Sequence, residues 1–150
     1  MSSSIAACEL FLFDELKDKY GYTTPQECFE DRVNHRQEWY ERICEYNKTD
    51  RAKLTKYILS KSDIYVGMRD KEEIEECIRQ SLFDIIIWVD ASERLPKEAG
   101  TSNNVGVEYA HFIVPNNGTL DEFIEKSLAI GNILSKAKRR ELAPSEEVQA

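Results

Sequence analysis

The chain has 150 residues and a formal net charge of −8, and its 41% hydrophobic and 32% charged residues are typical of one folded globular domain. The negative charge argues against an extended nucleic-acid surface and against binding to an anionic membrane. The longest strongly apolar run, 85–89, is far shorter than the roughly 20 residues needed to cross a bilayer, and no signal-peptide pattern is present, so we expect a cytoplasmic protein.

Helical patterns fill the first third of the chain. Apolar residues at helical spacing predict a helix over 5–20 that ends at Gly21. Thr24, with Pro25 after it and Glu27 at the third helical position, predicts the start of a second helix that continues to about Tyr46. A third helix is expected through 54–59.

The middle of the chain predicts a β-α-β unit. The β-branched and aromatic runs 64–66 and 85–89 are typical of buried strands, and 71–81 between them has helical spacing. Two strands joined by a helix are expected to be parallel, with a right-handed crossover.

A third apolar run, 112–114, precedes a turn and a last helix that Thr119 caps. We expect one domain over 1–135 and a charged, flexible tail over 136–150. The chain has four cysteines and no Cys-x-x-Cys pair, which favours small buried side chains in the core: Cys8, Cys28, Cys44 and Cys77.

Two arginines directly follow predicted strands. Ligands of parallel sheets bind at the carboxyl ends of the strands, so Arg69 and Arg94 are candidates for a phosphate or carboxylate clamp. The alternative is a pair of surface arginines neutralised by Asp70 or Glu93.

A second basic group lies within the predicted helix 25–46. Arg32 and Arg36 are four residues apart and share a helical face, with His35 beside them. An ordinary solvated face paired with nearby glutamates is the alternative. With only two histidines in the chain, no metal site is predicted.

Five stretches carry a family resemblance: Ser2 to Ser4, 30–40 (EDRVNHRQEWY), 63–69 (DIYVGMR), 87–96 (IWVDASERLP) and 116–120 (NNGTL). Together they resemble the phage-type deoxynucleoside monophosphate kinases, over nearly the whole chain up to about Leu134. The resemblance implies an α/β fold of the P-loop kinase kind, a three-layer parallel sheet flanked by helices. It also implies transfer of the γ-phosphoryl group of ATP, with Mg²⁺, to a deoxynucleoside monophosphate.

The resemblance also implies roles for particular residues. The substrate phosphate would be bound by Arg32, His35, Arg36, Ser3 and Ser4. The catalytic residues would be Arg69 and Arg94, and the adenine end of the cofactor would lie near Asn116, Asn117 and Thr119.

The sequence departs from this family at one feature. It contains no Gly-x-x-x-x-Gly-Lys-[Ser/Thr] loop, and it opens where the strand and loop of that unit should already have ended. We therefore expect the sheet to lack its P-loop strand, ATP-dependent transfer to be impaired, and ATP with Mg²⁺ to bind only if activity is retained. Unpaired neighbouring strands favour a homodimer or a protein partner that covers the exposed sheet.

Two functions follow as hypotheses. The first is a kinase-like protein that binds a nucleoside monophosphate. The second is a non-catalytic, phage-derived interaction protein that binds and modulates another protein. A longer protein, with a Gly-rich loop encoded upstream, is a third alternative.

Overall fold

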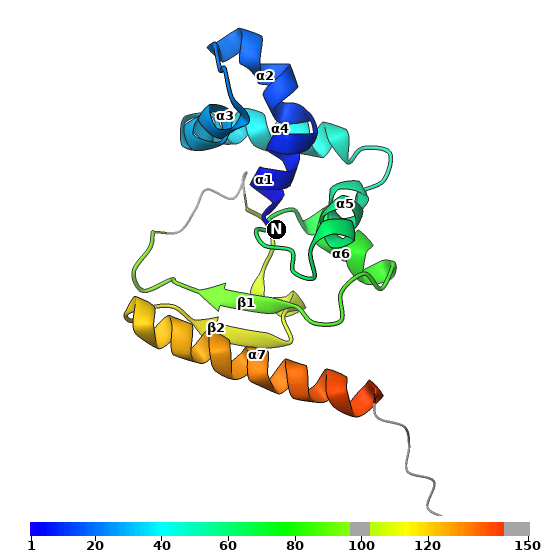
Figure 1. Ribbon diagram of the computed structural model, residues 1–150, viewed down its shortest axis with the longest axis vertical. Coiled ribbons are helices and arrows are strands. Elements are labelled where there is room, and N and C mark those ends of the chain that lie inside the picture. The colour runs from blue at the N-terminus through cyan, green and yellow to red at the C-terminus, as the bar shows by residue number, and fades with distance from the viewer. Residues whose placement is uncertain (97–102, 143–150) are drawn as a thin grey trace, which may run out of the picture. The chain divides into compact units, whose positions relative to one another are not determined.

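The computed structural model describes residues 1–96 and 103–142 and divides the chain into two compact units (Figure 1). The first unit is Met1–Asp84 with Glu98–Tyr109, and the second is Ile85–Lys97 with Ala110–Ala150. Within the described ranges, the named strands belong to the second unit, and no helix has both the length and the apolar character needed to span a membrane.

The first unit opens with one unbroken helical run. It consists of α1 (Ser3–Ala7), the π-helical turn η1 (Cys8–Leu12) and α2 (Phe13–Tyr20). Gly21 ends the run with φ of 74°, a left-handed conformation that favours glycine. The helix predicted over 5–20, and its end at Gly21, are confirmed.

The second predicted helix is interrupted. α3 (Pro25–Asp31) begins with the expected capping box, passes into the 3₁₀ turn η2 (Arg32–Asn34), and α4 (Arg36–Tyr46) begins after His35. The carboxylate of Asp31 accepts hydrogen bonds from Asn34 Nδ2 at 2.6 Å and from the Tyr22 hydroxyl at 2.5 Å, and it contacts His35 Nε2 at 3.0 Å. Such local side-chain bonds compete with the helical ladder and account for the break.

Replacing Thr24 with alanine is expected to lower the free energy of unfolding by about 1 kcal/mol. Thr24 Oγ1 accepts from the Glu27 amide at 3.2 Å, and Glu27 Oε2 accepts from the Thr24 amide at 3.2 Å. Urea unfolding of the variant tests this expectation. An unchanged midpoint and slope would show that the box contributes nothing to stability.

Two further helices complete the first unit. α5 (Lys53–Lys61) buries Leu54 and Ile58. Asp70 is the N-cap of α6 (Lys71–Arg79), and its Oδ1 accepts a hydrogen bond from the Glu73 amide at 2.9 Å. A short 3₁₀ turn, η3 (Val107–Tyr109), belongs to the same unit.

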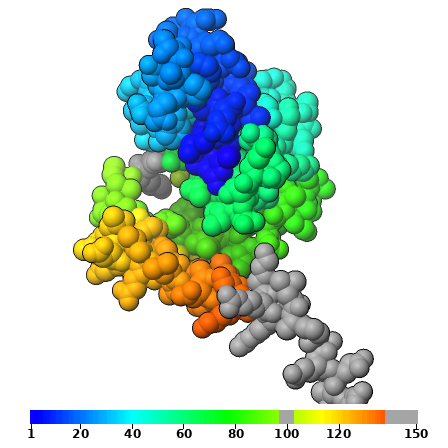
Figure 2. All heavy atoms as spheres, viewed as in Figure 1, coloured from blue at the N-terminus to red at the C-terminus, as the bar shows by residue number. Residues whose placement is uncertain are grey.

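One apolar cluster holds the helices of the first unit together, and the space-filling view shows these blue to cyan helices packed closely on the visible face (Figure 2). Its buried members are Ala6, Ala7, Cys8, Leu12, Leu16, Cys28, Trp39, Leu54 and Ile58. The thiols of Cys8, Cys28 and Cys77 are free and buried, as predicted, whereas Cys44 is only half-buried.

The strand predicted over 64–66 is wrong. This segment makes a single parallel bridge, between Ser2 and Val66, in which Ser3 N donates to Val66 O at 3.0 Å and Val66 N donates to Met1 O at 3.0 Å. Ser2 is already the N-cap of α1, and helical geometry begins at Ser3, so the pairing cannot continue.

The three-layer sheet of the P-loop kinase kind is also wrong. The sheet among the described residues has two parallel strands, β1 (Ile87–Asp90) and β2 (Phe112–Pro115), paired in register from Ile87 with Phe112 to Asp90 with Pro115. Most of the described chain is helical instead. A dimer or partner at the sheet remains a prediction.

The second unit joins this sheet to one long helix. α7 (Leu120–Leu142) packs against β2 and continues through 136–142, while 143–150 lie outside the described residues. Thr119 caps α7 as predicted: its Oγ1 accepts from the Glu122 amide at 3.3 Å, and Glu122 Oε2 accepts from the Thr119 amide at 2.8 Å.

Candidate functional site

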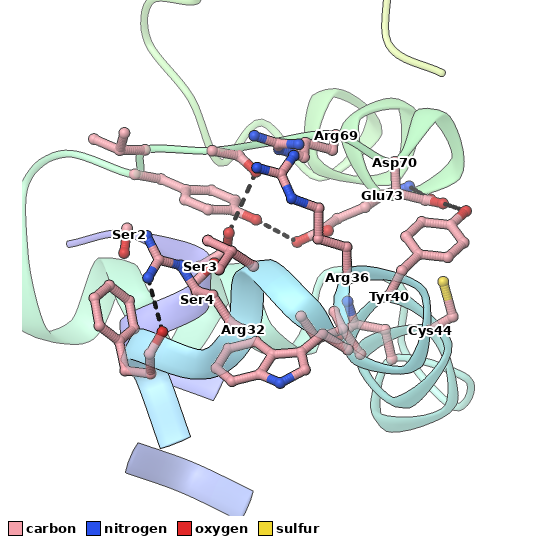
Figure 3. Close-up of a pocket in the computed structure, with 18 of the residues that line it drawn as sticks. Ser2, Ser3, Ser4, Arg32, Arg36, Tyr40, Cys44, Arg69, Asp70 and Glu73 are labelled. Atoms are coloured by element: carbon pink, nitrogen blue, oxygen red, sulfur yellow. Dashed lines mark hydrogen bonds between the residues drawn. The ribbon is translucent and has the colours of Figure 1, made fainter. Parts of the chain in front are cut away.

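A cavity of about 300 Å³ lies within the first unit (Figure 3). Its walls come from the start of α1, the α3 to α4 break, the face of α4, and the segment that leads from the Ser2 bridge into α6. The lining residues are Ser2, Ser3, Ser4, Phe29, Arg32, Val33, Arg36, Trp39, Tyr40, Ile43, Cys44, Asn47, Arg51, Tyr65, Val66, Gly67, Arg69, Asp70 and Glu73.

Three of the arginines singled out in the sequence, Arg32, Arg36 and Arg69, line this cavity. The helix break separates the first two, and Figure 3 shows Arg36 extending from α4 toward the segment that carries Arg69. The Arg32 guanidinium lies over the Phe29 ring at 3.8 Å and donates from Nη1 to Phe29 O at 2.7 Å. The chain is therefore locally basic here, despite its net charge of −8.

The serines form a second wall. Ser2, Ser3 and Ser4 all line the cavity, and Ser3 Oγ donates to Gly67 O at 3.3 Å. Gly67 has φ of 97°, and a Cβ atom built there would lie 3.1 Å from Ser3 Oγ. Glycine at 67 thus allows the chain to turn while it stays close to the first turn of α1.

Four aromatic side chains also line the cavity. Phe29, Trp39, Tyr40 and Tyr65 line the cavity, and the Trp39 residue is 4% exposed. The Trp39 Nε1–H is buried and meets no acceptor in the described part of the chain. A cavity with guanidinium groups and flat apolar rings can bind an anion attached to an aromatic ring system.

Two acidic side chains also reach the cavity. Asp70 Oδ2 accepts from the Tyr40 hydroxyl at 2.9 Å. Glu73 is 4% exposed, and burial raises the pKa of its carboxyl to about 7, although hydrogen bonds from Thr55 at 2.7 Å and Tyr65 at 3.3 Å act in the opposite direction. The lining thus contains four arginines, Arg32, Arg36, Arg51 and Arg69, and two acidic side chains, of which Glu73 is mostly neutral below pH 7.

Sequence reasoning missed Glu73, although one signal was present. Glu73 precedes Ile74 and lies one helical turn before Cys77, so it falls on the buried stripe of α6. An ionisable residue on a buried stripe is a candidate site residue.

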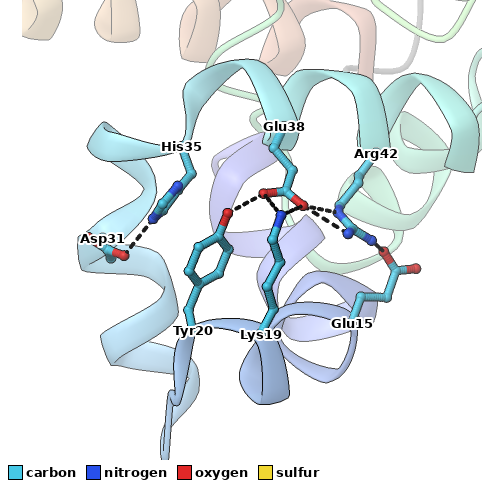
Figure 4. A network of polar contacts seen from close by, with 7 residues as sticks. All are labelled: Glu15, Lys19, Tyr20, Asp31, His35, Glu38 and Arg42. Carbon is cyan, nitrogen blue, oxygen red and sulfur yellow. Dashed lines mark hydrogen bonds and ion pairs between the residues drawn. The ribbon is translucent and has the colours of Figure 1, made fainter.

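His35 is not among the lining residues. Its Nε2 lies 3.0 Å from Asp31 Oδ2 and its ring packs on Tyr20 with 4.0 Å between centroids (Figure 4). Beside it, Glu38 accepts from the Tyr20 hydroxyl at 2.6 Å and from Lys19 Nζ at 2.9 Å, and these bonds lower the Glu38 pKa to about 2. This polar network joins α2 to α4 and gives His35 a structural position.

The other predicted residues lie together in the second unit, in the loops that follow β1 and β2. Arg94 Nε donates to Asn116 O at 2.6 Å, and Asn117 Oδ1 accepts from the Glu93 amide at 3.1 Å. The side chains of Asn117 and Thr119 thus hold a loop and cap a helix, and their place near the adenine end of a cofactor stays a prediction.

In the ranges that the structure describes, no three His, Cys, Asp or Glu side chains are grouped so as to hold a metal ion. Mg²⁺ in nucleotide sites is usually held by one or two carboxylates together with substrate phosphates and does not need such a group. Binding of ATP with Mg²⁺ stays a prediction.

Comparison with known proteins adds no relative. No family model, no curated protein and no solved structure matches the chain. The function proposed below rests on the residues of the cavity.

Proposed function

We propose that the cavity binds a nucleoside monophosphate. The observation that carries the proposal is the presence of Arg32, Arg36 and Arg69 in one cavity together with three serines and four aromatic side chains. Guanidinium groups recognise phosphate through paired N–H donors, and serine hydroxyls add further donors. The rings supply flat surfaces for a base.

The size of the cavity supports a small ligand. A volume of about 300 Å³ is at the lower end of the range for small-molecule sites, which favours a mononucleotide over a dinucleotide. The buried free thiols of the first unit suit the reducing cytoplasm, which we propose as the compartment.

Titration calorimetry with the four common deoxynucleoside monophosphates tests the proposal. Arg36→Gln and Arg69→Gln are each expected to weaken the best ligand by about tenfold or more, because hydrogen bonds to charged groups contribute about 1.5–3 kcal/mol. The corresponding nucleoside, which lacks the phosphate, is expected to bind far more weakly.

The matched control is Arg79→Gln. Arg79 lies on α6, its side chain is 70% exposed, and it pairs with Glu76 rather than lining the cavity. This variant should bind like the parent protein. Absence of binding for all four nucleotides, or equal losses in the control, would contradict the proposal.

The second candidate is the interaction protein. It is favoured by exposed apolar side chains on α7, where Leu120 is 70% exposed and Leu128 is 64% exposed. The same titration discriminates the two, because an interaction protein has no reason to bind nucleotides or to depend on Arg36.

A further inference from the structure

Among the described residues, Glu73 is the one buried carboxyl group that lines the cavity. We propose that Glu73 binds the ligand as a neutral carboxylic acid, which donates a hydrogen bond to the anion and couples anion binding to a proton. This inference rests on the proposed function and assigns to Glu73 a role in positioning and selecting the ligand.

The hydrogen bonds around Glu73 leave one oxygen for the ligand. Thr55 Oγ1 donates to Oε1 at 2.7 Å, and the Tyr65 hydroxyl donates to the same atom at 3.3 Å. Cys77 Sγ donates to Thr55 Oγ1 at 3.4 Å, so Thr55 accepts that bond and can donate its own hydroxyl proton to Glu73. Among the described residues, the bonds that hold the carboxyl thus end on Oε1, and Oε2 is the atom that can carry a proton toward a ligand.

Burial favours the neutral form of the thiols and phenols around Glu73. Burial raises the pKa of the thiols and phenols that face it: Tyr40 and Cys44 from α4, Tyr65, and Cys77 from α6. The arginines and the aspartate that line the same cavity are Arg32, Arg36, Arg51, Arg69 and Asp70. Burial raises the pKa of Glu73 to about 7, so this carboxyl is the group that titrates there.

Protonation changes what the cavity can hold. An ionised Glu73 repels a bound phosphate and offers it no donor, whereas the neutral acid removes the repulsion and supplies an O–H group. The anion therefore binds preferentially when Glu73 is protonated. When the anion binds to protein in which Glu73 is ionised, Glu73 takes up a proton. The affinity for the anion is expected to fall by up to tenfold for each pH unit above the pKa that Glu73 has in the ligand-free protein.

The test measures affinity from pH 7 to 8.5 with the deoxynucleoside monophosphate that binds best, and in parallel with sulfate. Over this range sulfate keeps its charge, and the phosphate, with a second pKa of about 6, is mostly doubly charged. A change of affinity with pH therefore reports the titration of a protein group and not of the ligand. Wild-type affinity for both anions should fall by about tenfold. Gln keeps a donor and an acceptor at this position but does not titrate, so the affinity of Glu73→Gln for both anions should change by less than twofold over the same pH range.

Glu75→Gln is the matched control, because Glu75 lies on the same helix, half-exposed and outside the cavity lining. It should keep the wild-type slope. A flat wild-type profile, or an unchanged slope in Glu73→Gln, would overturn the inference and leave nucleotide binding intact. Absence of binding at every pH would instead overturn the proposed function, and the inference with it.

Discussion

Replacing Leu12 with alanine is expected to lower the free energy of unfolding of the first unit by about 3 kcal/mol. Leu12 is fully buried at 0% exposure in η1, where it belongs to the apolar cluster that joins the helices of this unit. The truncation removes apolar surface and leaves a cavity that the packed helices can close only in part.

Urea unfolding followed by Trp39 fluorescence measures this loss. The chain has two tryptophans, so a Trp88→Phe background confines the signal to the first unit. Ile64→Ala is the control, because Ile64 is 66% exposed and its truncation should cost less than about 0.5 kcal/mol. Equal losses in Leu12→Ala and Ile64→Ala would show that the cluster does not hold the unit together.

The helices of the first unit were largely predictable because their signals are local. Gly21 and the Thr24 to Glu27 box lie at helix ends that the structure confirms. The break at η2 was not predicted, because it depends on Asp31, whose partners include Tyr22 from outside the helix. Hydrophobic spacing says nothing about such a bond.

The sheet was not predictable in the same way, because a strand depends on a partner far away in sequence. Residues 64–66 have strand-like composition, but the partner that they meet is Ser2, and the helix that starts at Ser3 ends the pairing. The resemblance supplied a many-stranded sheet that the chain does not form. By contrast, β1 and β2 fall within or beside apolar runs identified in the sequence.

The arginines of the cavity were predictable by residue type and spacing, and their common location was not. Arg32 and Arg36 were expected on one helical face, yet Arg32 belongs to η2 and Arg36 to α4, so they reach the cavity from different elements. Trp39 and Tyr65 are residue types that are common in cores, so sequence alone could not show that they also line a cavity.

The second large effect concerns Glu73 and pH. In the folded protein burial raises the pKa of the Glu73 carboxyl to about 7, whereas in the unfolded chain its pKa has the ordinary value of 4.5. The raised pKa stabilises the fold below pH 4.5, and this contribution is lost as the pH rises toward 7. A difference of about 2.5 pKa units corresponds to a loss on the order of 3 kcal/mol.

Glu73→Gln removes this titration and preserves an acceptor for Thr55 and Tyr65. The free energy of unfolding of the wild type, measured relative to the variant, should therefore fall by about 3 kcal/mol between pH 4 and pH 8. Urea unfolding at several pH values gives this difference directly, and a constant difference would mean that Glu73 has the same pKa in the folded and unfolded states. The buried Glu73 thus makes the fold less stable at neutral pH than at acid pH, and the proposed hydrogen bond to an anion in the cavity would give the neutral acid a function.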